Sequence, residues 1–144
     1  MTRPTPTSLE SYPYRITLQT RWADNDVYGH VNNSVYYFYF DTVVNRWLIE
    51  TGLLEIGKSD VIGLVVSTAC DYFAPISFPD TITAGLRAAK IGTSSVTYEI
   101  GIFRNDETTA SAQGTFTHVY VTEKTRRPSP ISDKMKNKLR EITP

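Results

Sequence analysis

The sequence predicts an α+β protein in which an antiparallel five-stranded sheet curls round one long helix. A segment of alternating polarity at 14–22 is typical of a strand, and an uninterrupted apolar segment follows it at 34–50. Four further strand-like segments then occur up to residue 122, with no helical pattern between them. This order favours consecutive antiparallel strands packed against one helix, with a short C-terminal helix at the end.

The length and composition fit one domain. The chain has 144 residues, of which 40% are hydrophobic and 21% are charged, as in ordinary globular proteins. Prolines and small polar residues dominate the first eight positions. We therefore expect a flexible N-terminal tail at 1–10 and a single domain at 11–144.

Charge and cysteine content argue against other classes of protein. Lys plus Arg and Asp plus Glu both number 15, and this zero net charge argues against a surface built for nucleic acid. No segment approaches the roughly 20 apolar residues of a membrane helix, and the N-terminus has no apolar signal segment. Cys70 is the single cysteine, so an intramolecular disulfide is impossible and we expect a cytoplasmic protein.

The first strand and the long helix are predicted from their periodicity and their ends. Alternation over 14–22 puts five residues on one side of the strand, namely Tyr14, Ile16, Leu18, Thr20 and Trp22. The segment 34–50 lacks Gly and Pro, Asn32 or Asn33 can cap its N-terminus, and Gly52 can end it. Its β propensity makes a strand a competitor, but its length without a turn favours a helix that is largely wrapped by protein.

Turn residues divide the rest of the chain into elements. Prolines, a Gly-Thr pair and an Asn-Asp pair separate four strands, at 63–74, 81–91, 95–104 and 110–122. Ser132 then caps a short helix that has Met135, Leu139 and Ile142 on one face.

The loop between the first strand and the long helix carries groups with catalytic potential. Asp24 and Asp26 lie directly before a helix N-terminus, whose free N–H groups can polarise a carbonyl and stabilise an oxyanion. A carboxylate beside such a carbonyl can attack it or activate water. On spacing alone, however, simple helix capping with a polar turn is the favoured interpretation.

Residues 24–36 resemble two motifs of hotdog-fold thioesterases. Asp24, Asp26 and Gly29 fit the Asp-x-Asp-x-x-Gly motif of the 4-hydroxybenzoyl-CoA thioesterase branch. The plant acyl-carrier-protein thioesterases carry Asp-x-Asp-x-Asn-x-His-Val-Asn-Asn-x-x-Tyr, which this chain matches at Asp24, Asp26, His30, Val31, Asn32, Asn33 and Tyr36. The resemblance covers nearly the whole chain and implies a single hotdog domain that hydrolyses a thioester.

The resemblance also implies roles for these residues. Asp26 aligns with the family's catalytic aspartate, which acts as nucleophile or general base. Amides at the helix start, including those of Asn32 and Asn33, would hold the thioester oxygen, and the site would lie at a subunit interface. Asp24 is expected to brace the loop, and Gly29 to permit close backbone approach or a positive φ.

Two departures from these motifs limit the transfer. Tyr28 stands where the plant enzymes have an Asn, so their Asn-His arrangement does not carry over as a unit. His30 is replaced by an aliphatic residue in many 4-hydroxybenzoyl-CoA-type enzymes, and its imidazole either orients water or the thioester or hydrogen-bonds within the loop. Tyr28 and Tyr36 are further candidates for substrate contact.

The basic C-terminal segment is a second candidate binding feature. Arg126 and Arg127 belong to a run of cationic residues that either forms a solvated surface or meets the phosphates of coenzyme A. His30 and His118 show no metal-ligand spacing, and Cys70 has no base beside it in the sequence. We therefore expect no metal and a structural thiol.

Together these features predict an acyl-CoA thioesterase that needs no dissociable cofactor and forms a homodimer or homotetramer. Because a thiol leaves readily, the loop and the helix start could supply the groups that the reaction needs. Cleavage of an acyl-carrier-protein thioester is an alternative within enzymes. A non-catalytic acyl-CoA-binding domain is the alternative outside them.

Overall fold

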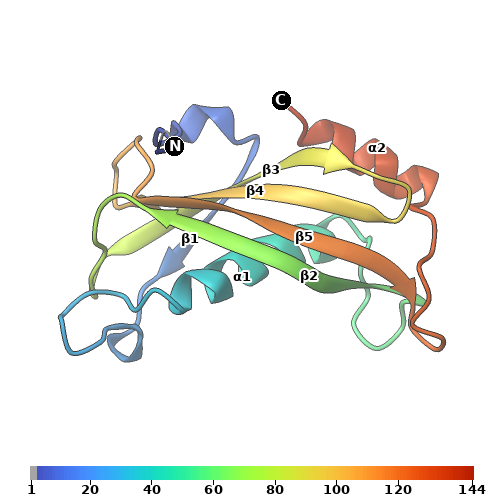
Figure 1. The fold of residues 1–144 in the computed structure, drawn as a ribbon, viewed down its shortest axis with the longest axis horizontal. Coiled ribbons are helices and arrows are strands. Elements are labelled where there is room, and N and C mark those ends of the chain that lie inside the picture. Colours follow the sequence, from blue (N-terminus) through green and yellow to red (C-terminus); the bar gives the residue numbers. More distant parts are fainter. Residues whose placement is uncertain (1–2) are drawn as a thin grey trace.

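A computed structural model describes residues 3–144, so that Met1 and Thr2 of the predicted tail lie outside the described residues. The elements in chain order are η1 (Leu9–Ser11), β1 (Tyr14–Gln19), η2 (Trp22–Asp24), α1 (Val35–Glu50), β2 (Val61–Tyr72), β3 (Thr81–Ile91), β4 (Ser95–Arg104), β5 (Ala112–Thr122) and α2 (Asp133–Glu141). The predicted α+β class, with its five-stranded antiparallel sheet, one long helix and a short C-terminal helix, is confirmed (Figure 1).

The sheet has the strand order β1-β3-β4-β5-β2, and all neighbouring strands are antiparallel. The prediction of consecutive strands is correct for β3, β4 and β5. It is wrong for β2, which pairs with β5 instead of β3. Turn residues mark where a strand ends but carry no information on its neighbour, so the crossover from β2 to β3 could not be read from them.

Helix α1 lies along one face of the sheet, and the core forms between the two (Figure 1). Phe40, Val43 and Val44 of the helix are completely buried there. Phe38 and Ile49 remain exposed, with 68% and 46% of their surface accessible. The prediction that the helix is wrapped by protein therefore describes most, but not all, of its apolar side chains.

Two predicted boundaries shift at the first strand and the helix start. β1 ends at Gln19 rather than at residue 22, because the Thr20 N–H donates to Asp80 O at 3.2 Å and the chain then turns into η2. Trp22 is 76% exposed and so does not continue the buried side of the strand. The helix begins at Val35, one residue later than predicted.

Both ends of the chain contact the sheet, through Thr7 near the N-terminus and through Ile142, whose backbone oxygen accepts from the Ala88 N–H at 2.9 Å. Ser132 Oγ accepts a hydrogen bond from the Met135 N–H at 3.1 Å, which confirms the predicted cap of α2. On the outer face of the sheet, the Thr7 N–H donates to Gln113 at 2.7 Å and Tyr12 is buried against Phe103.

Within residues 3–144, no helix is long and apolar enough to cross a membrane.

Candidate functional site

The loop between η2 and α1 folds into a tight turn at one end of the sheet. The Asp26 N–H donates to His30 O at 2.9 Å, and the Gly29 N–H donates to Asp26 O at 3.0 Å. Gly29 has a φ of +78°, the left-handed conformation expected of it. The turn thereby fixes the backbone that carries Asp26.

The Asp26 carboxylate is held by both of its oxygens. Oδ1 accepts from the Tyr28 N–H at 2.9 Å, and Oδ2 accepts from the Asn32 side-chain amide at 3.2 Å. A carboxylate has about four lone-pair sites, so each oxygen keeps one site for a further partner. The side chain is partly exposed, so these remaining lone pairs are open to a water molecule or a ligand.

The backbone amide of Asn33, just before the helix, is free for a ligand. The Asn32 N–H donates to Asp24 O at 2.9 Å, and the Ser34 N–H donates to Asn32 Oδ1 at 3.0 Å. Among residues 3–144, the Asn33 N–H has no hydrogen-bond acceptor. Of the two asparagine amides expected to hold the thioester oxygen, the structure thus offers the one of Asn33.

Tyr72, at the end of β2, anchors the residue that carries this amide. Its hydroxyl donates to Asn33 O at 2.9 Å, and its ring meets that of Tyr36 edge-on with 5.0 Å between centroids. Tyr36 is buried, and burial raises its pKa to about 12. Tyr36 and Tyr72 line a shallow hollow of about 310 Å³ together with His30 and Asn33.

Asp24 has the geometry of a brace. It is 2% exposed and accepts hydrogen bonds from the Arg21 N–H (2.9 Å), the Arg21 guanidinium (3.0 Å) and the Tyr39 hydroxyl (2.9 Å). Burial by itself would raise the pKa of Asp24, but the bonds from Arg21 and Tyr39 outweigh it and hold the pKa below 3.8. Its oxygens are already engaged, which fits the expected bracing role.

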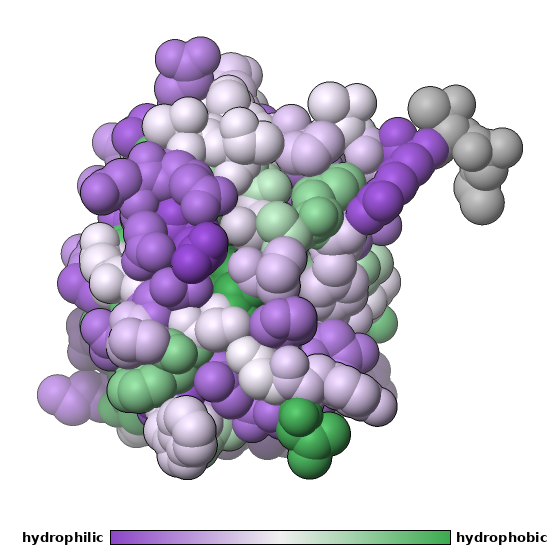
Figure 2. All heavy atoms as spheres, turned by 90° about the vertical axis from the view of Figure 1, so that its left-hand side faces the viewer, coloured by the Kyte–Doolittle hydropathy of each residue, from purple (hydrophilic) through white to green (hydrophobic). Residues whose placement is uncertain are grey.

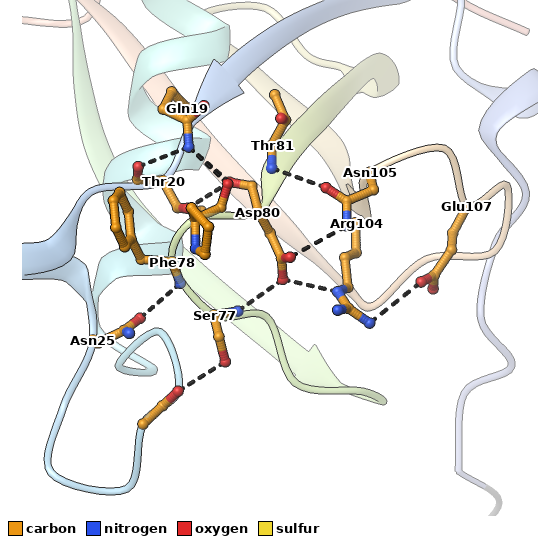
Figure 3. Close-up of polar contacts among 12 residues, drawn as sticks. Gln19, Thr20, Asn25, Ser77, Phe78, Asp80, Thr81, Arg104, Asn105 and Glu107 are labelled. Atoms are coloured by element: carbon orange, nitrogen blue, oxygen red, sulfur yellow. Dashed lines mark hydrogen bonds and ion pairs between the residues drawn. The ribbon is translucent and has the colours of Figure 1, made fainter.

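The β2–β3 connection supports the loop from the other side (Figure 3). The Ser77 hydroxyl donates to Gly29 O at 2.8 Å, and the Phe78 N–H donates to the Asn25 side chain at 3.0 Å. The Val31 N–H donates to Ile76 O at 2.7 Å. The position of Asp26 therefore depends on a segment about 50 residues further along the chain.

Asp80 holds that connection in place (Figure 3). Its carboxylate accepts from the Ser77 N–H at 3.0 Å, from Arg104 at 2.8 Å and from Asn105 at 3.2 Å. Burial opposes ionisation here too, but these bonds keep the pKa of Asp80 below 3.8. In the sequence, Asp80 directly follows Pro79 between two predicted strands, a position that indicates only a turn.

The surface around the loop exposes apolar side chains among polar ones (Figure 2). Val27 and Tyr28 are 93% and 82% exposed, and Trp22 packs edge-on against Phe78 with 6.1 Å between ring centroids. The His30 imidazole makes no hydrogen bond within residues 3–144, although its backbone oxygen does. Tyr28 and His30 are therefore available to a ligand or to another chain.

The structure does not bring Arg126 and Arg127 to the Asp26 loop of the same chain. They follow β5, at the end of the sheet where Thr122 pairs with Val61. The loop lies at the other end, where Tyr72 pairs with Ala112 and contacts Asn33. Twelve strand residues separate these ends, a length of about 40 Å.

Sequence reasoning missed Tyr39, Tyr72 and Asp80, because each acts on the loop from a distant part of the chain.

Burial raises the pKa of Cys70 to about 11, so its thiol stays protonated near neutral pH and is no nucleophile. Within residues 3–144, no three His, Cys, Asp or Glu side chains cluster in a way that could hold a metal ion.

Known proteins resemble this chain over most of its length. The model of the thioesterase-like superfamily matches residues 20–139. The solved PA5185 protein from Pseudomonas aeruginosa strain PAO1 is 47% identical, with a TM-score of 0.92 and 96% of each chain covered. A thioesterase from Thermus thermophilus, solved with coenzyme A and Zn, is 30% identical, with a TM-score of 0.75 over 91% of this chain and 95% of that one.

A more distant match is the uncharacterized protein YsmA of Bacillus subtilis strain 168, which is 23% identical over 87 residues, or 60% of this chain. The match spans 58% of the length of that relative.

Proposed function

Because this chain belongs to the thioesterase-like superfamily of thioester hydrolases, we propose that it hydrolyses acyl-coenzyme A thioesters with Asp26 and the Asn33 N–H. One observation carries the proposal. A carboxylate fixed by two hydrogen bonds lies a few residues before a helix-start amide that has no acceptor among residues 3–144. The coenzyme A bound to the Thermus thermophilus thioesterase supports coenzyme A as the leaving thiol.

The chemistry follows from these two groups. The Asn33 N–H, at the positive end of the α1 dipole, donates to the thioester oxygen and stabilises the charge that develops on it. Asp26 takes a proton from water as the water oxygen attacks the carbonyl carbon. The C–S bond then breaks, the thiolate leaves and takes up a proton, and the products are the free acid and coenzyme A.

Asp26 could instead attack the carbonyl directly. That route expels the thiolate first and leaves an acyl anhydride on the carboxylate, which water then hydrolyses. The hydrogen bonds from Tyr28 and Asn32 leave one lone-pair site on each oxygen and so permit both routes. Incorporation of ¹⁸O from labelled water into Asp26 during a single turnover would identify the anhydride route.

We further propose that the protein acts as a homodimer joined through β2. This strand lies at the edge of the sheet, is 12 residues long and carries one charged side chain, Asp71. Val65 and Val66 at its middle are 48% and 59% exposed. A long edge strand with a single charge near one end pairs readily with another chain, and antiparallel pairing with its own copy closes the edge with two-fold symmetry.

The decisive experiment is thiol release from a panel of purified acyl-CoAs, with matched acyl-carrier-protein thioesters alongside. We expect hydrolysis of at least one acyl-CoA at a kcat/KM above about 10⁴ M⁻¹s⁻¹. Hydrolysis of the carrier-protein thioesters alone would replace the proposed substrate class. Tight binding without hydrolysis would indicate a binding domain.

A further inference from the structure

Residues 3–12 form a strap that lies against the outer face of the sheet. The Ala110 N–H donates to Thr7 O at 2.9 Å, and the Leu9 N–H donates to Thr108 O at 2.9 Å. These bonds place the strap beside the turn between β4 and β5, at the end of the sheet where β2 ends (Figure 1). The Asp26 loop lies at the same end.

Gln113 of β5 binds the backbone of the strap with both ends of its side-chain amide. Its oxygen accepts from the Thr7 N–H at 2.7 Å, and its nitrogen donates to Thr5 O at 3.0 Å. Two bonds from one side chain fix both the position and the direction of the strap. Arg3, two residues before Thr5, is thereby held near the end of β2.

Tyr12 anchors the end of the strap that leads into β1. It is 1% exposed, and its hydroxyl shares a hydrogen bond of 2.8 Å with the Thr7 hydroxyl. The Arg87 guanidinium carbon lies 4.8 Å from the centroid of its ring. The ring lies on Gly85 and Gly101, which face each other on β3 and β4, and a methyl carbon at either position would come within 2.7 Å of Tyr12. The sheet is therefore shaped to hold this anchor.

At its other end, the strap contacts the last residue of β2 and the residue after it. The Arg3 guanidinium donates a hydrogen bond to Tyr72 O, and its carbon lies 5.1 Å from the centroid of the Phe73 ring. A charged donor strengthens the first contact, and the second has the geometry of a cation–π interaction. Arg3 thus holds both residues at once.

Tyr72 is the residue through which such a contact reaches the candidate site. Because β2 is at the edge of the sheet, Tyr72 has a neighbouring strand on one side only within its own chain. The end of an edge strand opens readily unless other contacts hold it. The Tyr72 hydroxyl donates to Asn33 O at 2.9 Å, and burial raises its pKa, so that it remains a donor at neutral pH. A displacement of Tyr72 would therefore displace the Asn33 amide.

We propose that Arg3 is a positioning residue for thioester hydrolysis, which holds Tyr72 and, through it, the Asn33 N–H in place for the thioester oxygen. The proposal rests on the proposed function. Phe73 lines the hollow beside the loop together with His30 and Asn33, so that Arg3 also supports one side of that hollow. The strap links the N-terminal segment of the chain to the oxyanion donor.

Arg3→Ala removes both contacts and tests the proposal. We expect kcat to fall about threefold, as for the loss of one exposed cation–π contact, with KM changed less than about twofold. Arg3→Lys can still donate to Tyr72 O and keeps a cation over Phe73, so it should restore most of the wild-type kcat. Arg46→Ala is the matched control, because it removes an exposed arginine that pairs with Glu50 on α1. An unchanged kcat in Arg3→Ala would overturn the proposal.

A double-mutant cycle shows whether Arg3 acts through the Tyr72 hydroxyl. Once Tyr72→Phe has removed the bond to Asn33 O, the position of this residue no longer controls the amide through that bond. We therefore expect the double variant Arg3→Ala, Tyr72→Phe to have the same kcat as Tyr72→Phe alone. Two effects that multiply in the double variant would overturn the proposal.

A readout without substrate separates this proposal from the proposed function. In ¹⁵N NMR spectra, Arg3→Ala should shift the signal of the Asn33 amide, whereas Arg3→Lys should shift it much less and Arg46→Ala should leave it in place. An Asn33 signal at its wild-type position in Arg3→Ala would overturn the proposal, whatever the activity. If the signal shifts but the wild-type protein hydrolyses no acyl-CoA, the failure is that of the proposed function.

Discussion

At the scale of single residues, Asp26 and Asp24 are carboxylates two positions apart with different surroundings. Asp26→Asn keeps the shape of the side chain and removes the negative charge that the proposed mechanism requires. We expect turnover to fall about 10²–10⁴-fold, with the urea midpoint nearly unchanged. Asp24→Asn is the comparison. Because Asp24 is buried and fully hydrogen-bonded, this variant should be less stable than the wild-type protein. Its turnover should fall less than that of Asp26→Asn. Near-wild-type turnover in folded Asp26→Asn protein would disprove the mechanism.

Tyr72 positions the proposed oxyanion donor without touching the substrate oxygen itself. Tyr72→Phe removes the hydrogen bond to Asn33 O and keeps the ring against Tyr36. We expect kcat to fall about fivefold, the equivalent of about 1 kcal/mol, with KM changed less than about twofold. Tyr14→Phe is the matched control, since it removes a hydroxyl that binds Glu50 away from the loop. Equal effects of the two variants would leave Tyr72 with a structural role alone.

At the scale of elements, the η2 loop and the β2–β3 connection each depend on an ionised carboxylate. The pKa values of Asp24 and Asp80 lie below 3.8 in the folded protein. Their contribution to stability is therefore complete above the unfolded value, near pH 4, and is lost as pH falls through the lower folded values. We expect the urea midpoint to be constant above about pH 4 and to drop as the pH falls further, because both folded pKa values are lowered. Asp80→Asn should flatten that drop, and an unchanged profile would contradict this assignment.

The elements also show what a sequence can predict. The bounds of β3 and β4 agree with the prediction residue for residue, because alternation and turn residues are local signals. The neighbour of β2 and the Tyr39 hydroxyl that binds Asp24 could not be predicted, since these contacts join different elements of the chain. The motif resemblance indicated Asp26, but the choice of the Asn33 amide over that of Asn32 needed the observed hydrogen bonds.

At the scale of the whole molecule, the β2 edge should decide the oligomeric state. Sedimentation at micromolar concentration is expected to give a dimer or a larger assembly. Val66→Lys, at the exposed middle of β2, should shift it toward monomer, because a charge on an edge opposes strand pairing. Thr17→Lys on β1, the other edge of the sheet, is the control. A wild-type protein that sediments as a folded monomer would exclude the β2 dimer.

The role of the basic residues after β5 in binding coenzyme A can be tested by comparing a full substrate with a truncated one. Replacing Arg126 and Arg127 with Ala should raise KM for acyl-CoA about tenfold and change KM for the corresponding pantetheine thioester much less, because the truncated substrate lacks the nucleotide phosphates. Lys136→Ala with Lys138→Ala on α2 removes the same charge elsewhere. Equal effects on both substrates would assign Arg126 and Arg127 to a solvated surface.

The strand order has a consequence for how the protein folds. β1 pairs with β3, so that Tyr14 meets Leu86, and the loop between β1 and α1 rests on the connection that precedes β3. Contacts between segments so far apart in sequence form slowly, after the local turns and helices. The Asp26 loop therefore acquires its final geometry only once the sheet is complete. A chain in which the sheet is still incomplete, whether during synthesis or during refolding, would contain Asp26 and Asn33 but would not hold them in the geometry described above.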